Sequence, residues 1–329
     1  MKLIFCETNN NEEMKKVALF GMLILIVLNV TAQRWKKNRW ELVGGMGTTF
    51  FMGDLGGGSG DAKRFLGVAD LDMAATRPAF QVGIRYKFVE VLSARANFAY
   101  GFISADDRFS GHYGRWLRNL HFRSQIFEMS TVAELYFIKE KIGSRYAISS
   151  GGLRNMISAY MFVGAGFFFY EPQAFSDLQD KWVNLRQLNT EGQGIVEGLE
   201  PYSPYGFAFP LGVGVKYNLL KNFAINVEMG LRYTNTDYID DVSDKYFNYK
   251  DYIIENSGKL TNEQLNLYTA ASEFTDRHKP YDFENGITTP YKTGKPYRGS
   301  PLFNDAYIFT MVSVVYKLKT SRSGLPKFE

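Results

Sequence analysis

Apolar and polar side chains alternate strictly along much of this chain, and this alternation constrains the fold more than any other feature of the sequence. Within Asn222–Asp237, one parity holds a row of six large apolar residues, namely Phe223, Ile225, Val227, Met229, Leu231 and Tyr233. The other parity holds polar or small residues, namely Ala224, Asn226, Glu228, Gly230, Arg232 and Thr234. Side chains of a strand point to opposite faces with a period of two, whereas a helix would scatter this pattern around its surface. We therefore predict a strand with one apolar face.

Seven further segments are predicted to be strands. Four of them show the same clear parity, at 80–88, 92–102, 127–137 and 207–217. Three others show a weaker alternation, at Trp40–Met52, Ser158–Tyr170 and Ala306–Leu318. Together with the strand above, they predict an eight-stranded, all-β protein.

Large aromatic residues recur at the ends of the predicted strands, for example at Tyr86, Tyr100, Tyr170 and Tyr217. This placement is typical of the aromatic girdles at the two interfaces of an outer-membrane barrel. The alternation also explains how 16% aromatic residues coexist with a mean hydropathy of only −0.22, since the two faces cancel in the average. We therefore predict an antiparallel transmembrane β-barrel rather than a secreted soluble β-protein. The apolar parity, including the row from Phe223 to Tyr233, is predicted to face outer-membrane lipids.

The opposite parity carries charges of both signs, which we predict to form ion pairs in the lumen: Arg85, Arg95, Glu128, Glu134, Glu228 and Arg232. Such residues either line a pore or pair and close it. The interior of an eight-stranded barrel is just wide enough to be filled by side chains, so closure is favoured over porin activity.

The lengths of the connections predict the topology. Residues 89–91 and 218–222 form tight links, which alternate with long loops at about 53–76, 105–120, 171–205 and 238–303. Outer-membrane barrels place short turns in the periplasm and long loops outside, so both termini are expected in the periplasm. The link 139–157 is an exception, because it is long for a periplasmic turn.

The N-terminus has the pattern of a secretory signal peptide. Basic residues precede the apolar run Val17–Leu28, and Val30 and Ala32 supply small residues before a cleavage site. We predict a signal peptide at 1–32, with 1–13 upstream of an alternative start at Met14. The barrel then spans 33–319, followed by a periplasmic tail at 320–329. The single cysteine, Cys6, precedes the cleavage site and excludes a disulfide scaffold.

Candidate chemistry is sparse. A net charge of +4 without a long basic cluster gives no nucleic-acid-binding face. The glycine-rich stretch 53–60 lacks the Lys and Ser or Thr of a phosphate loop and is expected to be a turn. The nearest approach to a rim hydrolase is Asp106 and Asp107 with His112 or His121, and solvated loop residues are the favoured interpretation.

Four aspartates, at 237, 240, 241 and 244, could hold calcium, but their spacing fits no defined calcium loop, so a solvated rim is expected. We therefore predict no catalytic residues, no metal, no cofactor and no small-molecule substrate.

Several segments resemble the PorG-like outer-membrane barrels of the type IX secretion system of Bacteroidetes. They are Phe51–Gly56, Arg118–Ser124, Thr190–Gly194, Pro210–Tyr217, Glu228–Thr234, Thr236–Ser243 and Arg298–Pro301, followed by Asn304 and Asp305. The ordered set covers nearly the whole mature chain and is more specific than any single segment.

This resemblance implies a non-enzymatic barrel associated with the periplasmic ring of PorK and PorN, in a system that exports proteins and supports gliding in some species. We expect the link 139–157 and the tail to contact the ring, through Lys139, Lys141, Arg145, Leu325 and Lys327. The alternative is a surface adhesion or ligand-binding barrel that uses the aromatic-rich loop Tyr246–Phe303.

Overall fold

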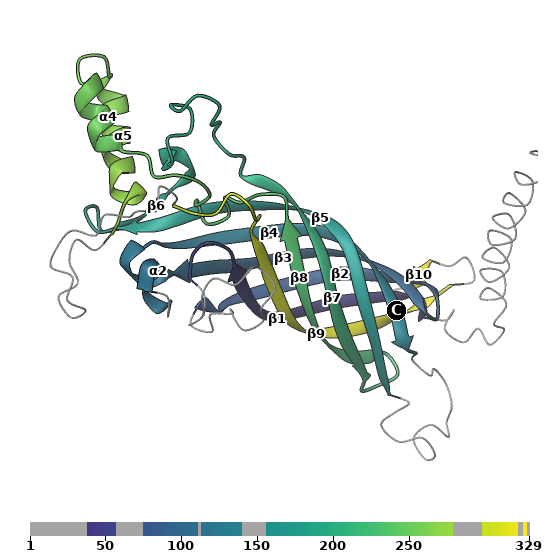
Figure 1. Ribbon diagram of the computed structural model, residues 1–329. Helices are drawn as coiled ribbons and strands as arrows, with labels where there is room; N and C mark the ends of the chain where they lie inside the picture. Colours follow the sequence, from purple (N-terminus) through teal and green to yellow (C-terminus); the bar gives the residue numbers. More distant parts are fainter. Residues whose placement is uncertain are drawn as a thin grey trace, which may run out of the picture.

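The protein is an antiparallel barrel of eight strands with a helical hairpin at one end (Figure 1). The computed structural model describes residues 38–56, 75–110, 113–139, 156–278, 298–321 and 325–327. The predicted signal peptide, His112, Lys141 and Arg145 lie outside these residues.

Eight long strands form the wall of the barrel: β1 (Trp40–Met52), β2 (Arg77–Val89), β3 (Leu92–Asp106), β4 (His121–Ile138), β5 (Ile157–Ser176), β7 (Tyr205–Asn218), β8 (Phe223–Thr234) and β9 (Ala306–Thr320). Each strand pairs antiparallel with the next, and β1 pairs with β9 from Trp40↔Leu318 to Met52↔Ala306, which closes the ring. All eight predicted strands are confirmed. β4 and β5 extend further than predicted, by several residues at the end that carries the helices.

Burial follows the alternation along each strand, with the apolar parity on the outside. On β8 the outward Val227 is 47% exposed, whereas the neighbouring inward Glu228 is 3% exposed. Apolar residues outside and charged residues inside invert the arrangement of a soluble protein, and this inversion is what a barrel surrounded by lipid requires. The eight-stranded barrel is therefore a transmembrane barrel of the outer-membrane type.

Inward glycines on β7 leave room for aromatic rings of the adjacent β5. A Cβ atom on Gly214 would collide with the ring of Tyr160, and one on Gly212 would meet the ring of Phe162. Since both rings are buried, the small residues of this parity serve to accommodate large side chains inside a narrow barrel.

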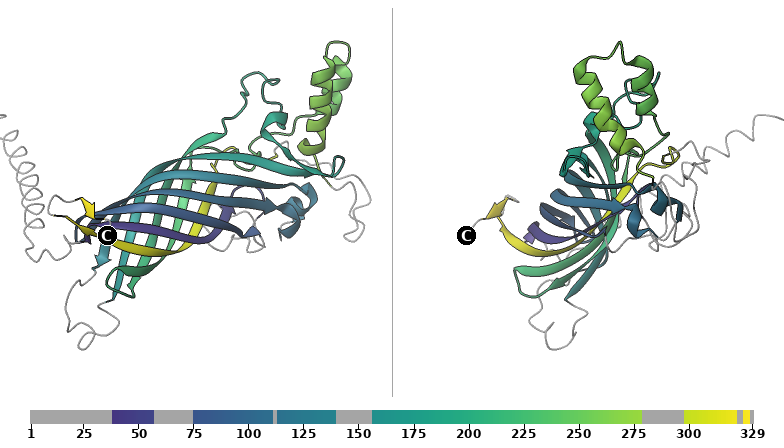
Figure 2. Two further views of the ribbon diagram at one scale, coloured as in Figure 1. Left: turned by 180° about the vertical axis from the view of Figure 1, so that it is seen from behind. Right: turned by 90° about the vertical axis from the view of Figure 1, so that its left-hand side faces the viewer.

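We call the two ends of the barrel the loop end and the terminal end. The terminal end is where β1 begins and β9 ends, and it carries the short links 90–91 and 219–222. There β10 (Pro326–Lys327), within the predicted tail, pairs back onto Lys319 and Thr320 of β9. The loop end lies opposite and carries the helical hairpin (Figure 2).

The loop end holds all the remaining described elements. They are the 3-10 turns η4 (Asp107–Phe109) and η6 (Arg186–Leu188), the strand β6 (Lys181–Asn184), which pairs with β5, and the helices α2 (Tyr113–Arg118), α4 (Tyr249–Asn256) and α5 (Asn262–Thr275). In the described part of the chain, no helix is long and apolar enough to span a membrane.

The helices α4 and α5 form a hairpin with its own small core. Tyr249, Ala271 and Phe274 pack with Leu185 and Leu188 from the preceding loop. Thr261 begins α5 with a capping box, in which its side chain and that of Gln264 each accept a hydrogen bond from the other residue's backbone. The described part of the aromatic-rich loop therefore buries apolar side chains within the hairpin and against residues 185–188.

Candidate functional site

Charged side chains fill the half of the lumen nearest the terminal end. Arg85 on β2 lies 2.8 Å from Glu41 on β1 and 2.7 Å from Glu134 on β4. Lys87 and Lys216 also contact Glu41, at 2.6 Å and 3.0 Å. All five side chains are almost completely buried, so each charge is compensated by its neighbours rather than by water.

A second set of ion pairs continues toward the loop end. Arg95 on β3 lies 2.9 Å from a carboxylate oxygen of Glu134 and 2.9 Å from one of Glu228. Gln81 and Tyr160 donate further hydrogen bonds to Glu228, each at 2.9 Å. Glu228 on β8 is therefore held by residues from three other strands.

The structure connects four of the six charged residues that the alternation directs to the lumen, in the chain Arg85, Glu134, Arg95 and Glu228. The other two form a separate pair, with 3.3 Å between Arg232 and Glu128. Tyr307 donates a hydrogen bond of 2.9 Å to the same carboxylate of Glu128. All six side chains lie inside the barrel and are buried.

An apolar plug occupies the lumen between these ion pairs and the loops. It comprises buried residues of the barrel wall, namely Phe51, Ile103, Phe122, Ile126, Phe168, Tyr170 and Phe309, joined by Leu55, Leu120, Ile239 and Val242 from the loops. The parity of each strand shows which residues point inward. It does not show that inward aromatic residues of several strands lie at the same height in the lumen, because that depends on how the strands are aligned with one another. Ion pairs and plug together occupy the lumen at successive levels, as expected for an eight-stranded barrel whose interior is filled by side chains.

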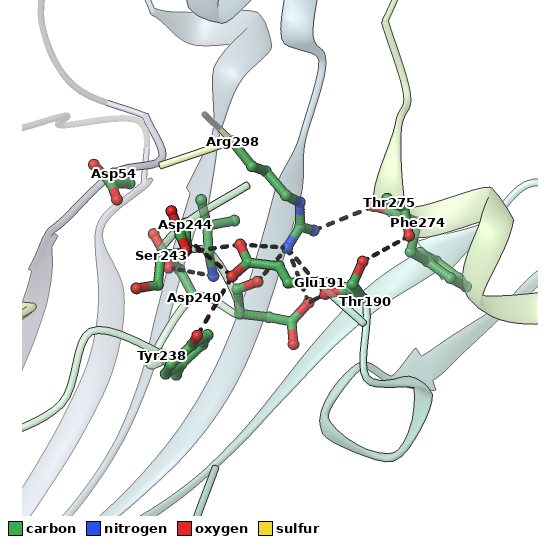
Figure 3. A network of polar contacts seen from close by, with 12 residues as sticks. Asp54, Thr190, Glu191, Tyr238, Asp240, Ser243, Asp244, Phe274, Thr275 and Arg298 are labelled. Carbon is green, nitrogen blue, oxygen red and sulfur yellow. Dashed lines mark hydrogen bonds and ion pairs between the residues drawn. The ribbon is translucent and has the colours of Figure 1, made fainter. Parts of the chain in front are cut away.

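Above the plug, the loops form a cap, which we define as the described residues 53–56, 107–120, 185–204, 235–247 and 298–305. Two buried arginines, Arg118 and Arg298, connect these loops, and Figure 3 shows Arg298 among its partners. Arg298 contacts Glu191 at 3.3 Å and Thr190 at 2.9 Å, and it donates to the carbonyl of Phe274 in α5 at 3.2 Å. The cap therefore holds the helical hairpin as well as the loops.

Arg118 makes the second connection. Its guanidinium lies 2.7 Å from Asp107 and donates to the backbone carbonyls of Asp54 and Arg298, each at 2.7 Å. Three loops that are far apart in sequence therefore meet at one planar group, which suits the fork geometry of arginine.

Acidic side chains tie the cap together from the other side. Glu191 accepts hydrogen bonds from the backbone amides of Ser243 and Asp244, at 2.9 Å and 3.0 Å. Asp241 accepts from the hydroxyls of Thr190 and Tyr202, at 2.5 Å and 2.6 Å. These contacts join residues 190–202 to residues 241–244.

Asp54, Asp237, Asp240 and Asp305 are carboxylates of the cap that form no ion pair with a described basic side chain, whereas Asp107, Glu191 and Asp241 do. Burial raises the pKa of Asp237 to about 8, and the carboxylates of Asp54 and Glu191 act in the same direction. Burial also raises the pKa of Asp240 and of Asp305 well above the usual range for aspartate. We infer that the cap holds protons on some of these carboxyl groups near neutral pH.

The expectation of a solvated rim is wrong for Asp237, Asp240 and Asp241, which are buried, whereas Asp244 is half-buried. Asp240 accepts hydrogen bonds from the amides of Leu55 and Val242, so loop backbone replaces water around it. Within the described ranges, no group of three or more His, Cys, Asp or Glu side chains is arranged to hold a metal ion.

The side chains weighed as a rim hydrolase are engaged elsewhere. Asp106 pairs with Arg108 at 2.6 Å, and Asp107 pairs with Arg118. His121 lies opposite Asp106 across β3 and β4, and its Nε2 accepts a hydrogen bond from the amide of Phe175 at 3.0 Å.

The residues predicted to contact a partner lie at the terminal end where they are described. Lys139 follows β4 and is exposed, and Leu325 is 63% exposed. Lys327 pairs through its backbone in β10. The row predicted to face lipid, from Phe223 to Tyr233, lies on the outer surface of β8.

The segments that carry the resemblance to PorG-like barrels converge in space. Asp54, Arg118, Glu191, Asp241 and Arg298 come from five of these segments, and all five residues take part in the cap network. In the sequence these residues belong to separate motifs, and only the packing of the loops brings them into one network.

Comparisons with solved structures return eight-stranded outer-membrane proteins. The attachment invasion locus protein Ail of Yersinia pestis is 9% identical, with a TM-score of 0.35, covering 85% of this chain and 98% of that one. Neisserial surface protein A is 7% identical, with a TM-score of 0.36 and coverages of 84% and 96%. OprG from Pseudomonas aeruginosa is 9% identical, with a TM-score of 0.33 and coverages of 86% and 98%.

A search of curated proteins finds no match to the sequence. Among family models, the one described as "Domain of unknown function (DUF6089)" matches residues 19–280, which include most of the barrel and much of the cap. The chain therefore belongs to the DUF6089 family.

Proposed function

We propose that this protein is a non-enzymatic outer-membrane component of the type IX secretion machinery that anchors the periplasmic PorK and PorN ring. The observation that carries the proposal is the convergence of the resembling segments in the cap. Arg298 and Glu191 belong to two of these segments, and their side chains are in contact although they are 107 positions apart in the sequence. The resemblance therefore extends to residues that form one buried unit, which is more than a set of independent short motifs would provide.

The filled lumen supports a structural role rather than transport through the barrel itself. Arg95 and Glu228 contact each other across the interior, and Phe122 and Phe168 belong to the plug above them. A barrel whose interior is occupied by its own side chains is suited to hold other proteins at the membrane.

We place the loop end outside the cell and the terminal end in the periplasm. The links at the terminal end include the tight turns 90–91 and 219–222, whereas the connections at the loop end are long. Outer-membrane barrels follow this rule, so the ring would lie beneath the terminal end.

Deletion of the gene, followed by complementation, tests this proposal. We expect the deletion to abolish export of type IX cargo and to reduce recovery of the ring with outer membranes, and the intact gene should restore both. Normal export together with normal ring recovery in the deletion strain would contradict the proposal.

The alternative of a surface adhesin rests on the hairpin of α4 and α5, which projects beyond the barrel (Figure 1). Ile254 is 72% exposed on α4, yet Tyr249 and Phe274 are buried inside the hairpin. Removing residues 249–275 distinguishes surface adhesion from a role in protein export. Loss of surface binding with normal export would favour adhesion, whereas unchanged binding would exclude this loop as an adhesive element.

A further inference from the structure

Basic and apolar side chains lie together along one arc of the terminal end, which we call the rim arc. Its members are Lys139, Leu219, Leu220, Lys221, Lys319 and Leu325. All six are exposed, and Leu220 and Leu325 are 66% and 63% exposed. Leucines with this exposure in turns, outside the regular outward rows of the strands, present apolar surface beyond the strand ends.

Backbone contacts make the arc continuous around the barrel. Asn218 donates to the carbonyl of Met156, which joins the start of β5 to the turn 219–222. Lys317 of β9 donates to the carbonyl of Asn222, and Ser321 donates to that of Leu325. The arc therefore follows the wall from β4 and β5, through the turn between β7 and β8, to the end of β9.

Charge is distributed unequally between the two ends. At the terminal end, Glu90 is the one acidic residue among the described link residues, which are 90–91, 139, 156 and 219–222. The cap at the loop end instead contains an excess of buried carboxylates over arginines.

We infer that the rim arc is a docking surface for an acidic protein face. This inference rests on the proposed function. It states that the periplasmic ring presents an acidic face, which the rim arc would bind. The lysines attract an acidic partner and orient it, whereas the leucines supply the apolar area that holds it once water is displaced. Lipid headgroups are the other source of negative charge at a membrane surface. The turn 219–222 lies beyond Tyr217 and Phe223, the strand-end aromatic residues that mark the membrane interface, so its leucines lie on the aqueous side, where a protein rather than lipid covers them.

Charge reversal in the full-length protein tests the assignment. The test variant carries Lys139→Glu, Lys221→Glu and Lys319→Glu. The matched control carries Lys181→Glu, Lys250→Glu and Lys259→Glu, which make the same change in charge at three exposed lysines of the loop end. Both variants are produced in the native membrane, and the ring is recovered by purification of the barrel protein.

We expect the test variant to recover at least about tenfold less ring than the wild type, because three attractive contacts become repulsive. The control variant should recover the wild-type amount. A third variant with Lys139→Arg, Lys221→Arg and Lys319→Arg keeps the charge and should retain the ring. Recovery with the wild type should also fall when the salt concentration is raised from about 0.1 M to about 0.5 M.

Each outcome has a distinct meaning. If the wild type itself recovers no ring, the proposed function is wrong. If the wild type recovers the ring and the reversed variant does so equally well, the docking surface is wrong while the proposed function stands. If the reversed variant no longer shows the gel shift of a folded barrel, whereas the control does, the lysines serve membrane insertion and the docking surface is likewise overturned. Leu219→Ser with Leu220→Ser should reduce ring recovery without changing its dependence on salt.

Discussion

Arg95 on β3 and Glu228 on β8 form an ion pair across the lumen, with 2.9 Å between Nη2 and Oε2. In the ring order β1, β2, β3, β4, β5, β7, β8, β9, these two strands stand on opposite walls. A direct contact between opposite walls means that single side chains bridge the interior. The pair therefore joins two opposite walls through the interior of the barrel.

Replacement of Arg95 by methionine is expected to destabilise the barrel by about 3–5 kcal/mol, because it leaves a buried carboxylate without its partner. The measurement is the urea midpoint of unfolding in lipid vesicles. Arg108→Met removes the exposed pair with Asp106 and is the control. It should cost at most about 1 kcal/mol. Equal midpoints for the two variants would show that the luminal pair contributes little.

Val227→Arg should impair insertion, because Val227 faces outward near the middle of β8. A charge at the bilayer midplane of a barrel costs about 2–4 kcal/mol, and the cost falls to about 0–1 kcal/mol near the interfaces. Phe223→Arg, at the terminal end of the same strand, is therefore the control and should insert almost normally. The folded fraction in vesicles, read from the gel shift on heating, distinguishes them. Normal insertion of Val227→Arg would argue against a lipid-facing β8.

Arg298→Ala should loosen the cap while leaving the barrel intact. The guanidinium contacts Glu191, Asp241 and the carbonyl of Phe274, so its removal frees two carboxylates and the end of α5. We expect protease on intact cells to cleave the loops roughly ten times faster, a change equivalent to about 1.4 kcal/mol in the opening equilibrium. The exposed Lys250→Ala is the control. A simultaneous loss of the folded-barrel gel shift would show that cap and barrel fold as one unit.

The cap should become less stable as pH rises. Asp237 has a folded pKa of about 8, and Asp241 one of about 6, against an ordinary value of 3.8. Between the ordinary pKa and the raised pKa, the closed cap binds more protons than the opened cap. The contribution of these protons to the stability of the cap is therefore complete below about pH 4 and decreases as the pH rises to about 8. Loop cleavage at pH 8.5 should exceed that at pH 5.5. Asp237→Asn should reduce this difference, and an unchanged pH profile would show that Asp237 is ionised in the closed cap.

The strands were predictable because their signal is local. The alternation around Phe223 and Val227 identifies both the strand and its outward face, and the structure confirms the same division in β8. Gly212 and Gly214 show a limit of this reasoning. Their parity predicts an inward position, but the rings of Phe162 and Tyr160 that require them lie on another strand.

The helical hairpin was not predicted, although one local signal was present. Thr261 and Gln264 have the spacing of a capping box, which marks the start of α5. The two helices have only a weak apolar stripe. Their buried residues, such as Tyr249 and Phe274, pack in one small core with Leu185 and Leu188 from the preceding loop. A helix whose partner lies about 80 residues earlier leaves little periodic trace in its own sequence.

The sequence by itself determined which side chains face lipid and which face the lumen, because a strand has only two faces and their order repeats every two residues. Only the tertiary structure decided which charges meet. Arg95 pairs with Glu228 because the closed ring brings opposite walls within reach of one side chain. Asp240 is buried rather than solvated because loops from distant parts of the chain, including Leu55, close over it. Such contacts depend on the register and closure of the whole barrel, which no local pattern contains.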